Sequence, residues 1–195
     1  MPCPVAILAG GASRRFGSDK ARVSVNHQPL ILQNLKQLSK TFLPVWIIGP
    51  AVDTYADLGL ACIPDPKPHC GPMAGVITAL KHCEQTRGPR VCAIVACDTL
   101  LTPANVQTLA QLTKGFPPHA AVVAPHVDNH WQPVFAAYHT RAQPLLSESL
   151  SQDQPSLSRW LNQAGSKAIR ATNITLPASF NTPDELKQQA TAKQK

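Results

Sequence analysis

The fold of this chain is decided by its first stretch, Val5-Ala6-Ile7-Leu8-Ala9-Gly10-Gly11. A continuous apolar run that ends in glycines is typical of a central strand buried on both faces. Runs of the same type return later, at 45–49 (VWIIG), 91–96 (VCAIVA) and 120–124 (AAVVA). Strands of this kind predict a mostly parallel sheet, because a strand that is apolar at every position must be covered on both faces.

Amphipathic segments separate these strands. Apolar residues recur there at helical spacing in two groups, Ile31, Leu35, Leu38 and Phe42, and then Met73, Val76, Ile77 and Leu80. Thr102-Pro103 and Thr182-Pro183-Asp184-Glu185 have the pattern of helix starts. Later signals predict strands at 134–138 and 167–172 and helices at 141–150 and 156–164. This alternation predicts an α/β fold, with a single doubly wound, mostly parallel sheet and helices on both faces.

Length and composition favour one soluble domain. The chain has 195 residues, of which 44% are hydrophobic, so we expect a single domain over 1–195 with a disordered tail at about 190–195. No apolar run approaches the roughly 18 residues of a membrane span, and the first residues lack the features of a signal peptide. These observations predict a cytoplasmic protein without a membrane partner.

The basic residues are scattered, apart from one local cluster. The chain carries 18 lysines and arginines against 11 acids, a net charge of +7, and the cluster consists of Arg14, Arg15, Lys20 and Arg22. A nucleic-acid binder more often shows a basic stripe with interleaved aromatic residues, which here make up only 5% of the chain. The compact cluster therefore favours an anionic small molecule over nucleic acid.

The six cysteines form no C-x-x-C pair. His69-Cys70 and His82-Cys83 are adjacent residues, which is poor geometry for one tetrahedral metal site. We expect the cysteines to be small buried apolar residues or free surface thiols.

The loop after the first strand has the composition of an anion site. Gly10-Gly11 lets the backbone approach a ligand closely, and Arg15 and Lys20 add positive charge. The loop is neither a Walker A motif nor G-x-G-x-x-G. From the residues alone, an ordinary tight turn with solvated arginines remains an alternative.

Two acids follow strands at the edge where ligands bind in open α/β sheets. Asp98 comes directly after the run 91–97, where one carboxylate with substrate phosphates can hold a divalent cation. Its alternative role is to cap the turn at Thr102-Pro103. Asp65 follows the short run 61–63 and is a second acid on the same edge.

Five motifs, in order, resemble those of the molybdenum cofactor guanylyltransferases, the MobA-like nucleotidyltransferases. LAGGASRRFGSDK at 8–20 is similar to the family's nucleotide-binding signature, and Asp65 with Gly71–Gly75 resembles its aspartate before G-P-x-A-G. Cys97-Asp98-Thr99 looks like the metal aspartate motif. QPVFAAY at 132–138 and NTPDEL at 181–186 resemble its later strand and closing helix start. The motifs occur in the correct order within residues 5–186, which makes the resemblance far more specific than any one of them.

The chain departs from the family pattern at several places. Phe16 stands where methionine is usual, and Leu100-Leu101 stands where the family places a proline soon after the aspartate. Ile47-Ile48-Gly49 replaces an asparagine that contacts the nucleotide in some members. Branches that use CTP usually read L-A-A-G, so Gly11 favours the guanine branch.

The resemblance implies transfer of GMP from GTP to molybdopterin, with release of pyrophosphate and with Mg²⁺ as cofactor. It implies catalytic roles for Arg15, Lys20 and Asp98, with Asp98 as the metal ligand. Nucleotide binding is implied for Leu8, Ala9, Gly10, Gly11, Lys20, Asp65 and Asp98. The pterin is expected near 132–138 and Asn181, and cofactor-insertion proteins or molybdoenzymes are candidate protein partners.

Two other functions remain open. One is a cytidylyltransferase or sugar-phosphate nucleotidylyltransferase, because related domains share a glycine-rich start and a metal acid. The other is a non-catalytic accessory protein that binds a nucleotide or cofactor. The joint presence of Arg15, Lys20 and Asp98 argues against the second, since a binding module does not need both leaving-group cations and a metal acid.

Overall fold

The central strand of the fold is β1 (Val5–Leu8), as its sequence predicts. The computed structural model describes residues 2–9, 19–67, 71–88, 90–151, 156–172 and 174–179. Within them, eight strands form one sheet. Seven of these strands have the spatial order β11 (Ala168–Ala171), β8 (Val122–Val127), β10 (Phe135–His139), β6 (Val91–Ala96), β1, β4 (Val45–Gly49) and β5 (Ile63–Pro64). The eighth strand, β9 (His130–Trp131), pairs with β8. Along that order every strand runs parallel to β1 except β10.

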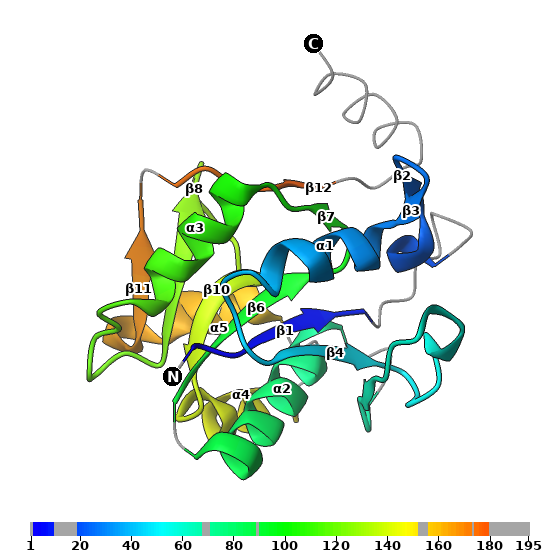
Figure 1. The fold of residues 1–195 in the computed structure, drawn as a ribbon. Helices are drawn as coiled ribbons and strands as arrows, with labels where there is room; N and C mark the ends of the chain where they lie inside the picture. The colour runs from blue at the N-terminus through cyan, green and yellow to red at the C-terminus, as the bar shows by residue number, and fades with distance from the viewer. Residues whose placement is uncertain are drawn as a thin grey trace.

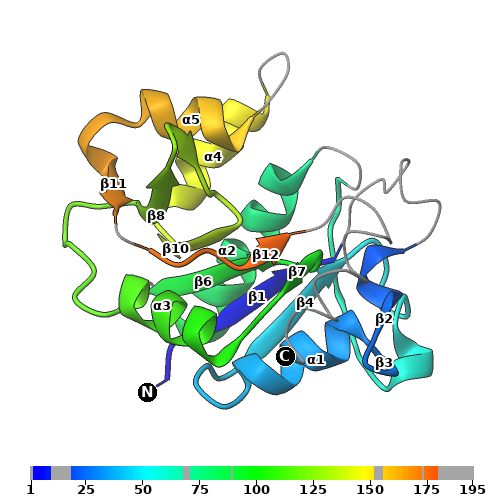
Figure 2. The same cartoon turned by 90° about the horizontal axis from the view of Figure 1, so that it is seen from above.

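Helices cover both faces of this sheet, which confirms the predicted doubly wound α/β architecture. Figure 1 shows α1 (Leu30–Leu38) and α3 (Pro103–Thr113) on one side of the strands. The other side carries α2 (Pro72–Arg87), α4 (Ala142–Leu150) and α5 (Leu157–Gln163). Seen from above in Figure 2, α1 and α3 lie side by side across the sheet. No helix in the described residues is both long and apolar enough to span a membrane.

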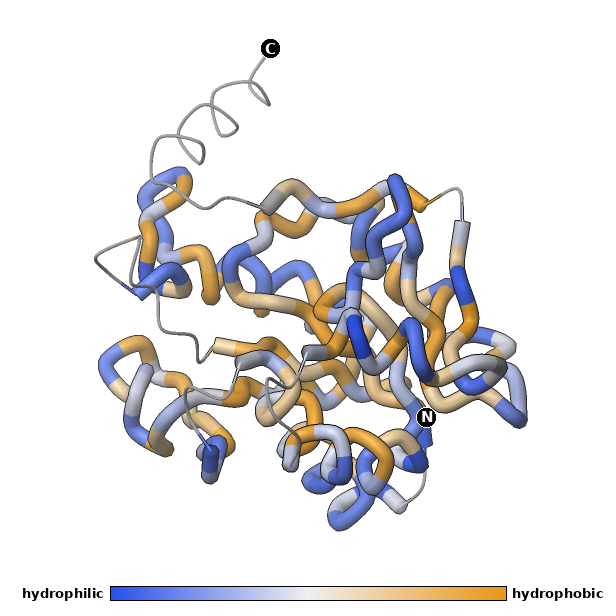
Figure 3. Tube along the Cα trace, turned by 180° about the vertical axis from the view of Figure 1, so that it is seen from behind, coloured by the Kyte–Doolittle hydropathy of each residue, from blue (hydrophilic) through white to orange (hydrophobic). Residues whose placement is uncertain are grey.

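Alternation along the strands divides the core into two layers. Ala6 and Leu8 of β1 face α2, whereas Val5 and Ile7 belong to the layer under α1 and α3. All four residues of β1 are buried because both layers use them. In Figure 3 the apolar stretches gather mostly in the middle of the molecule and the hydrophilic stretches mostly at its periphery.

One predicted strand is shifted in the structure. The run 120–124 ends before Pro125, but β8 continues through it to Val127 and forms a hairpin with β9. The turn between them places Asp128 and Asn129 at φ 49° and 60°, which is the left-handed region that closes two-residue hairpins. The hairpin therefore extends the strand beyond the point where the apolar run stops.

The predicted helix start at Thr102-Pro103 and the later elements are confirmed to within one residue. Thr102 accepts a hydrogen bond from the backbone of Asn105, and the Asn105 side chain accepts one in return from Thr102. Helices α4 and α5 lie within one residue of the bounds expected for them, and β10 and β11 correspond to the expected strands at 134–138 and 167–172. The helix start at Thr182–Glu185 lies outside the described residues.

Short elements complete the described chain. They are the 3₁₀ turns η1 (Lys20–Arg22), η2 (Ala56–Leu58) and η3 (Gly165–Lys167) and the strand pairs β2 (Ser24–Val25) with β3 (Gln28–Pro29) and β7 (Thr99–Leu100) with β12 (Ala178–Ser179).

The sheet reverses its direction of growth at β1. The chain builds β4 and β5 on one side of β1 and then crosses to the other side to form β6. At such a switch point the connections leave the neighbouring strands in opposite directions, and a crevice opens at the carboxyl ends. These ends lie on the right of Figure 1, where the arrows of β1 and β6 point.

Candidate functional site

The end of β1 is held tightly by its neighbours. Leu8 pairs with Ile48 on one side and Ala96 on the other, and its carbonyl accepts a hydrogen bond from the Cys97 amide at 3.0 Å. The Ala9 amide donates to the Ile48 carbonyl at 2.8 Å. This amide is therefore already used in the sheet and does not point to a ligand.

The structure joins two of the residues predicted from sequence. Asp19 caps η1 by accepting a hydrogen bond from the Ala21 amide, which fixes the start of the turn that carries Lys20. The Lys20 ammonium donates to Oδ2 of Asp98 at 3.0 Å. Their side chains are 17% and 29% exposed, so both groups are partly open to solvent.

Asp98 does not take its alternative role as a helix cap. The cap of α3 is made by Thr102 and Asn105, and Asp98 instead lies in the turn between β6 and β7. The Thr99 hydroxyl closes this turn by donating to the Ala96 carbonyl at 2.8 Å. Burial, and to a lesser degree the neighbouring Asp98 charge, raise the pKa of Cys97 to about 12, so its thiol stays protonated at neutral pH.

Asp65 is placed on the same edge but well away from Asp98. The two acids follow β5 and β6, which are three strand spacings apart in the sheet, a separation of about 14 Å at roughly 4.8 Å per strand. Asp65 is buried and accepts hydrogen bonds from the Lys67 amide at 3.0 Å and the Thr78 hydroxyl at 3.5 Å. One cation therefore cannot bind both acids, and a role for Asp65 would concern another part of a ligand.

The glycines of the G-P-x-A-G segment have separate structural uses. Gly71 precedes α2 with φ 75°, a conformation that L side chains rarely adopt. Gly75 faces the end of β1, where an added Cβ would lie 3.3 Å from Cδ2 of Leu8. The segment thus lets α2 begin sharply and pack closely beneath the crevice.

Arg22 of the basic cluster supports the same edge together with Tyr55 and Asp57, two residues that the sequence analysis did not select. The Arg22 guanidinium binds both carboxylate oxygens of Asp57, at 2.6 and 2.8 Å, and lies over the ring of Tyr55. Tyr55 is fully buried and donates its hydroxyl to the Ala9 carbonyl at 3.2 Å. Arg22 holds the pKa of Asp57 below its usual value. Arg22 therefore braces η1 against the segment around η2.

The start of β10 lies on the other side of Asp98. Because β10 is antiparallel to β6, its first residue Phe135 pairs with Val95 near the carboxyl end of β6. The Ala96 amide donates to the Val134 carbonyl at 2.9 Å. The stretch 132–134 therefore borders Asp98 on the side opposite β1 and β4.

The donor set is compatible with one divalent cation at Asp98. Lys20 engages Oδ2, and a carboxylate offers about four lone-pair positions, so a metal can be added beside that contact. Among the described residues no group of three or more His, Cys, Asp or Glu is arranged to hold a metal. A single carboxylate completed by phosphate oxygens is the usual arrangement for Mg²⁺.

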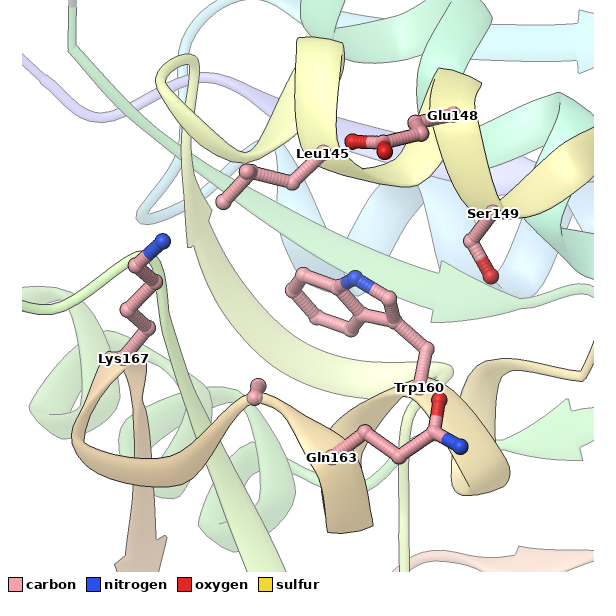
Figure 4. A pocket seen from close by; sticks show the side chains of 7 residues that line it. Leu145, Glu148, Ser149, Trp160, Gln163 and Lys167 are labelled. Atoms are coloured by element: carbon pink, nitrogen blue, oxygen red, sulfur yellow. The ribbon is translucent and has the colours of Figure 1, made fainter.

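Two pockets lie apart from the Lys20–Asp98 pair. The larger, about 500 Å³, lies beside Asp65 and includes Lys67, Thr78, Lys81 and His82. Figure 4 shows the smaller, about 260 Å³, in which Trp160 lies among Leu145, Glu148, Gln163 and Lys167. The smaller pocket includes no residue of the predicted site.

Several predicted residues lie outside the described part of the chain. They are Gly10, Gly11, Arg15 and Asn181, together with Arg14 of the basic cluster. Of the cysteines, Cys62, Cys83 and Cys92 are free and buried, as expected for small apolar side chains, and Cys70 is not described.

Comparison with known sequences identifies the family. A sequence model of the MobA-like NTP transferase domain matches residues 5–168. The chain belongs to this family. A MobA-like relative from Bacillus subtilis, named probable molybdenum cofactor guanylyltransferase, is 33% identical over 187 residues, covering 92% of this chain and 90% of the relative.

Solved structures share the MobA-like fold. Molybdopterin-guanine dinucleotide biosynthesis protein A from Archaeoglobus fulgidus has a TM-score of 0.74 at 20% identity, with 98% of each chain covered. CMP:2-keto-3-deoxy-manno-octonic acid synthetase in complex with CTP has a TM-score of 0.72 at 12% identity, again with 98% of each chain covered. At these identities the similarity establishes the fold of the MobA-like domain and leaves the choice of nucleotide to other arguments.

Proposed function

We propose that this MobA-like protein transfers GMP from GTP to the terminal phosphate of molybdopterin, giving molybdopterin guanine dinucleotide and pyrophosphate. The observation that carries the proposal is the Lys20–Asp98 pair, an ammonium and a carboxylate 3.0 Å apart at the switch point of a nucleotidyltransferase sheet. The name of the Bacillus subtilis relative and the glycine pair at 10–11 favour guanine as the base.

The chemistry requires two anions to meet. A phosphate oxygen of molybdopterin forms a bond to the α-phosphorus of GTP, while the bond from that phosphorus to the bridging oxygen of the β-phosphate breaks. The electron pair of the broken bond leaves with pyrophosphate. Positioning and charge neutralisation therefore matter more than proton transfer.

The residues of the site divide these tasks. Lys20, beside Asp98, brings positive charge to the place where the triphosphate would lie, and Arg15 acts with it on the β- and γ-phosphates. Asp98 would hold Mg²⁺ together with phosphate oxygens, and the ion supplies charge neutralisation and polarisation of the phosphoryl group. Gly10 and Gly11, which follow Leu8 and Ala9 in the sequence, would let the backbone approach guanine closely.

The order of strands supports separate positions for the nucleotide, which donates GMP, and the pterin, which accepts it. The β1 and β4 side of Asp98 would take the nucleotide, with Asp65 at its far end beside the larger pocket. The stretch 132–134 borders Asp98 on the opposite side and would take the pterin. In this arrangement both substrates approach Asp98, where the new bond to the α-phosphorus forms.

The proposal is tested by pyrophosphate release. Purified protein with Mg²⁺ and molybdopterin is incubated with GTP, CTP, ATP or UTP, each also without molybdopterin. We expect release with GTP that depends on molybdopterin. A preference for CTP would favour the cytidylyltransferase alternative, because the CTP-bound synthetase described above has the same fold. Binding of GTP without turnover would indicate an accessory protein.

A further inference from the structure

The loop that carries Asp98 is held by a side chain from a different part of the fold. Asn34, in the middle of α1, is fully buried, one of few buried polar residues in the described core. Its Nδ2 donates to the Thr99 carbonyl at 2.6 Å, and its Oδ1 accepts from the Leu101 amide at 3.1 Å. A single amide group therefore binds two backbone groups just after Asp98.

These contacts fix the residue next to Asp98 from one side, and the turn fixes it from the other. The Thr99 hydroxyl binds the Ala96 carbonyl at 2.8 Å, so Asp98 lies between two anchored points of the backbone. The pairing of β12 with β7 holds the same segment, with Ala178 opposite Leu100. The backbone on both sides of Asp98 is therefore fixed before any ligand arrives.

Asn34 is a polar residue on a helix whose other buried side chains are apolar. Leu30, Ile31 and Leu38 are buried on the same helix, and an amide among them costs free energy unless it is fully hydrogen-bonded. Asn34 meets this condition through the loop of Asp98.

We propose that Asn34 is a positioning residue for Asp98, holding the carboxylate where it binds the cation of the bound nucleotide. The inference rests on the proposed function, because it gives Asp98 the metal. When an outer-shell residue that orients a metal ligand is removed, metal affinity typically falls by about 10–100-fold.

The test measures metal binding directly. Mn²⁺, as a substitute for Mg²⁺, is titrated into the full chain in the presence of GTP, and bound Mn²⁺ is followed by the relaxation of water protons. Asn34→Leu replaces the amide by an apolar group of similar size, and Asn34→Ser removes the same two contacts with less bulk if the leucine variant does not fold. We expect half-saturation to need about 10–100 times more Mn²⁺ than in the wild type.

Thr140→Val is the control. Thr140 is also a buried polar residue, but it follows β10 at the opposite end of the sheet, where His139 pairs with Val91, the first residue of β6. A variant that merely loses stability should behave like this control, whose Mn²⁺ affinity we expect to equal that of the wild type. If Asn34→Leu and Asn34→Ser also bind Mn²⁺ like the wild type, the positioning role is wrong.

The two proposals fail in different ways. If the wild type and Asp98→Asn bind Mn²⁺ equally in the presence of GTP, Asp98 is not the metal ligand and the proposed site is wrong. If Asp98→Asn loses Mn²⁺ while the Asn34 variants keep it, only the role of Asn34 is overturned. If both lose it and Thr140→Val keeps it, the inference holds.

Discussion

Replacing Asp98 by asparagine separates the proposed catalytic role of this acid from its contribution to stability. The change keeps the size of the side chain and an oxygen that can accept from Lys20, but it removes the charge that would hold Mg²⁺. The Lys20–Asp98 pair is partly exposed to solvent, at 17% and 29% for the two side chains, so its loss should cost about 1 kcal/mol of stability or less. In a chain of 195 residues this lowers Tm by about 2–4 °C.

The effect on turnover should be much larger. We expect kcat to fall by about 100-fold or more, which corresponds to about 2.7 kcal/mol of transition-state stabilisation. The assay is pyrophosphate release with GTP, molybdopterin and Mg²⁺, run beside a thermal melt of each variant. Asp128→Asn is the matched control, because it removes a carboxylate from an exposed hairpin turn that tolerates asparagine equally well. Activity of Asp98→Asn close to that of the wild type would refute the role of this acid.

Other variants and conditions test separate parts of the site and the fold. Lys20→Ala and Arg15→Ala should weaken the use of GTP, while the activity of each variant should depend on salt concentration little more than that of the wild type. Equal effects on the binding of GTP and of guanosine would show that neither side chain acts on phosphate. Gly11→Ala should shift relative kcat/KM toward CTP by about 1–3 kcal/mol, because the added methyl group crowds the larger base; an unchanged ratio would limit Gly11 to the turn. Cys97, whose pKa burial raises to about 12, should resist iodoacetamide in the native protein and react once the chain is unfolded, as peptide mass spectrometry can check. Burial and a nearby arginine lower the pKa of His139 below 6.5, so the unfolded chain takes up a proton first and stability should fall as pH drops through 6.5. In His139→Gln the free energy of unfolding, measured with urea, should depend less on pH there, and an unchanged dependence would contradict this assignment.

Much of the architecture can be predicted from apolar runs, because a buried parallel strand leaves a continuous signal. Val45–Gly49 and Val91–Ala96 match the sequence prediction residue for residue. The strand that begins at Val122 was harder to bound, since Pro125 ends its apolar run while the hairpin pairing continues. Asp128-Asn129 is a recognisable turn signal that would have corrected this boundary.

The site could be predicted only in part. Asp98 and Lys20 are found from the motifs, but their direct contact depends on how η1 and β6 meet, which no local pattern encodes. Asn34 acts through two hydrogen bonds, and Tyr55 through one, to backbone groups far away in the sequence. A polar residue on the apolar face of a predicted helix, as Asn34 is, was the one available signal, because such a residue must find partners in the core.

The central claim is tested most directly by following the α-phosphorus of GTP. The wild-type protein is incubated with Mg²⁺, molybdopterin and GTP labelled at the α-phosphorus, and the products are separated and weighed by mass spectrometry. The account predicts that the label moves into a molybdopterin dinucleotide that contains guanine, with one pyrophosphate released for each dinucleotide formed. Label that stays in GTP, appears in free GMP, or enters a dinucleotide only when CTP carries it would contradict the account.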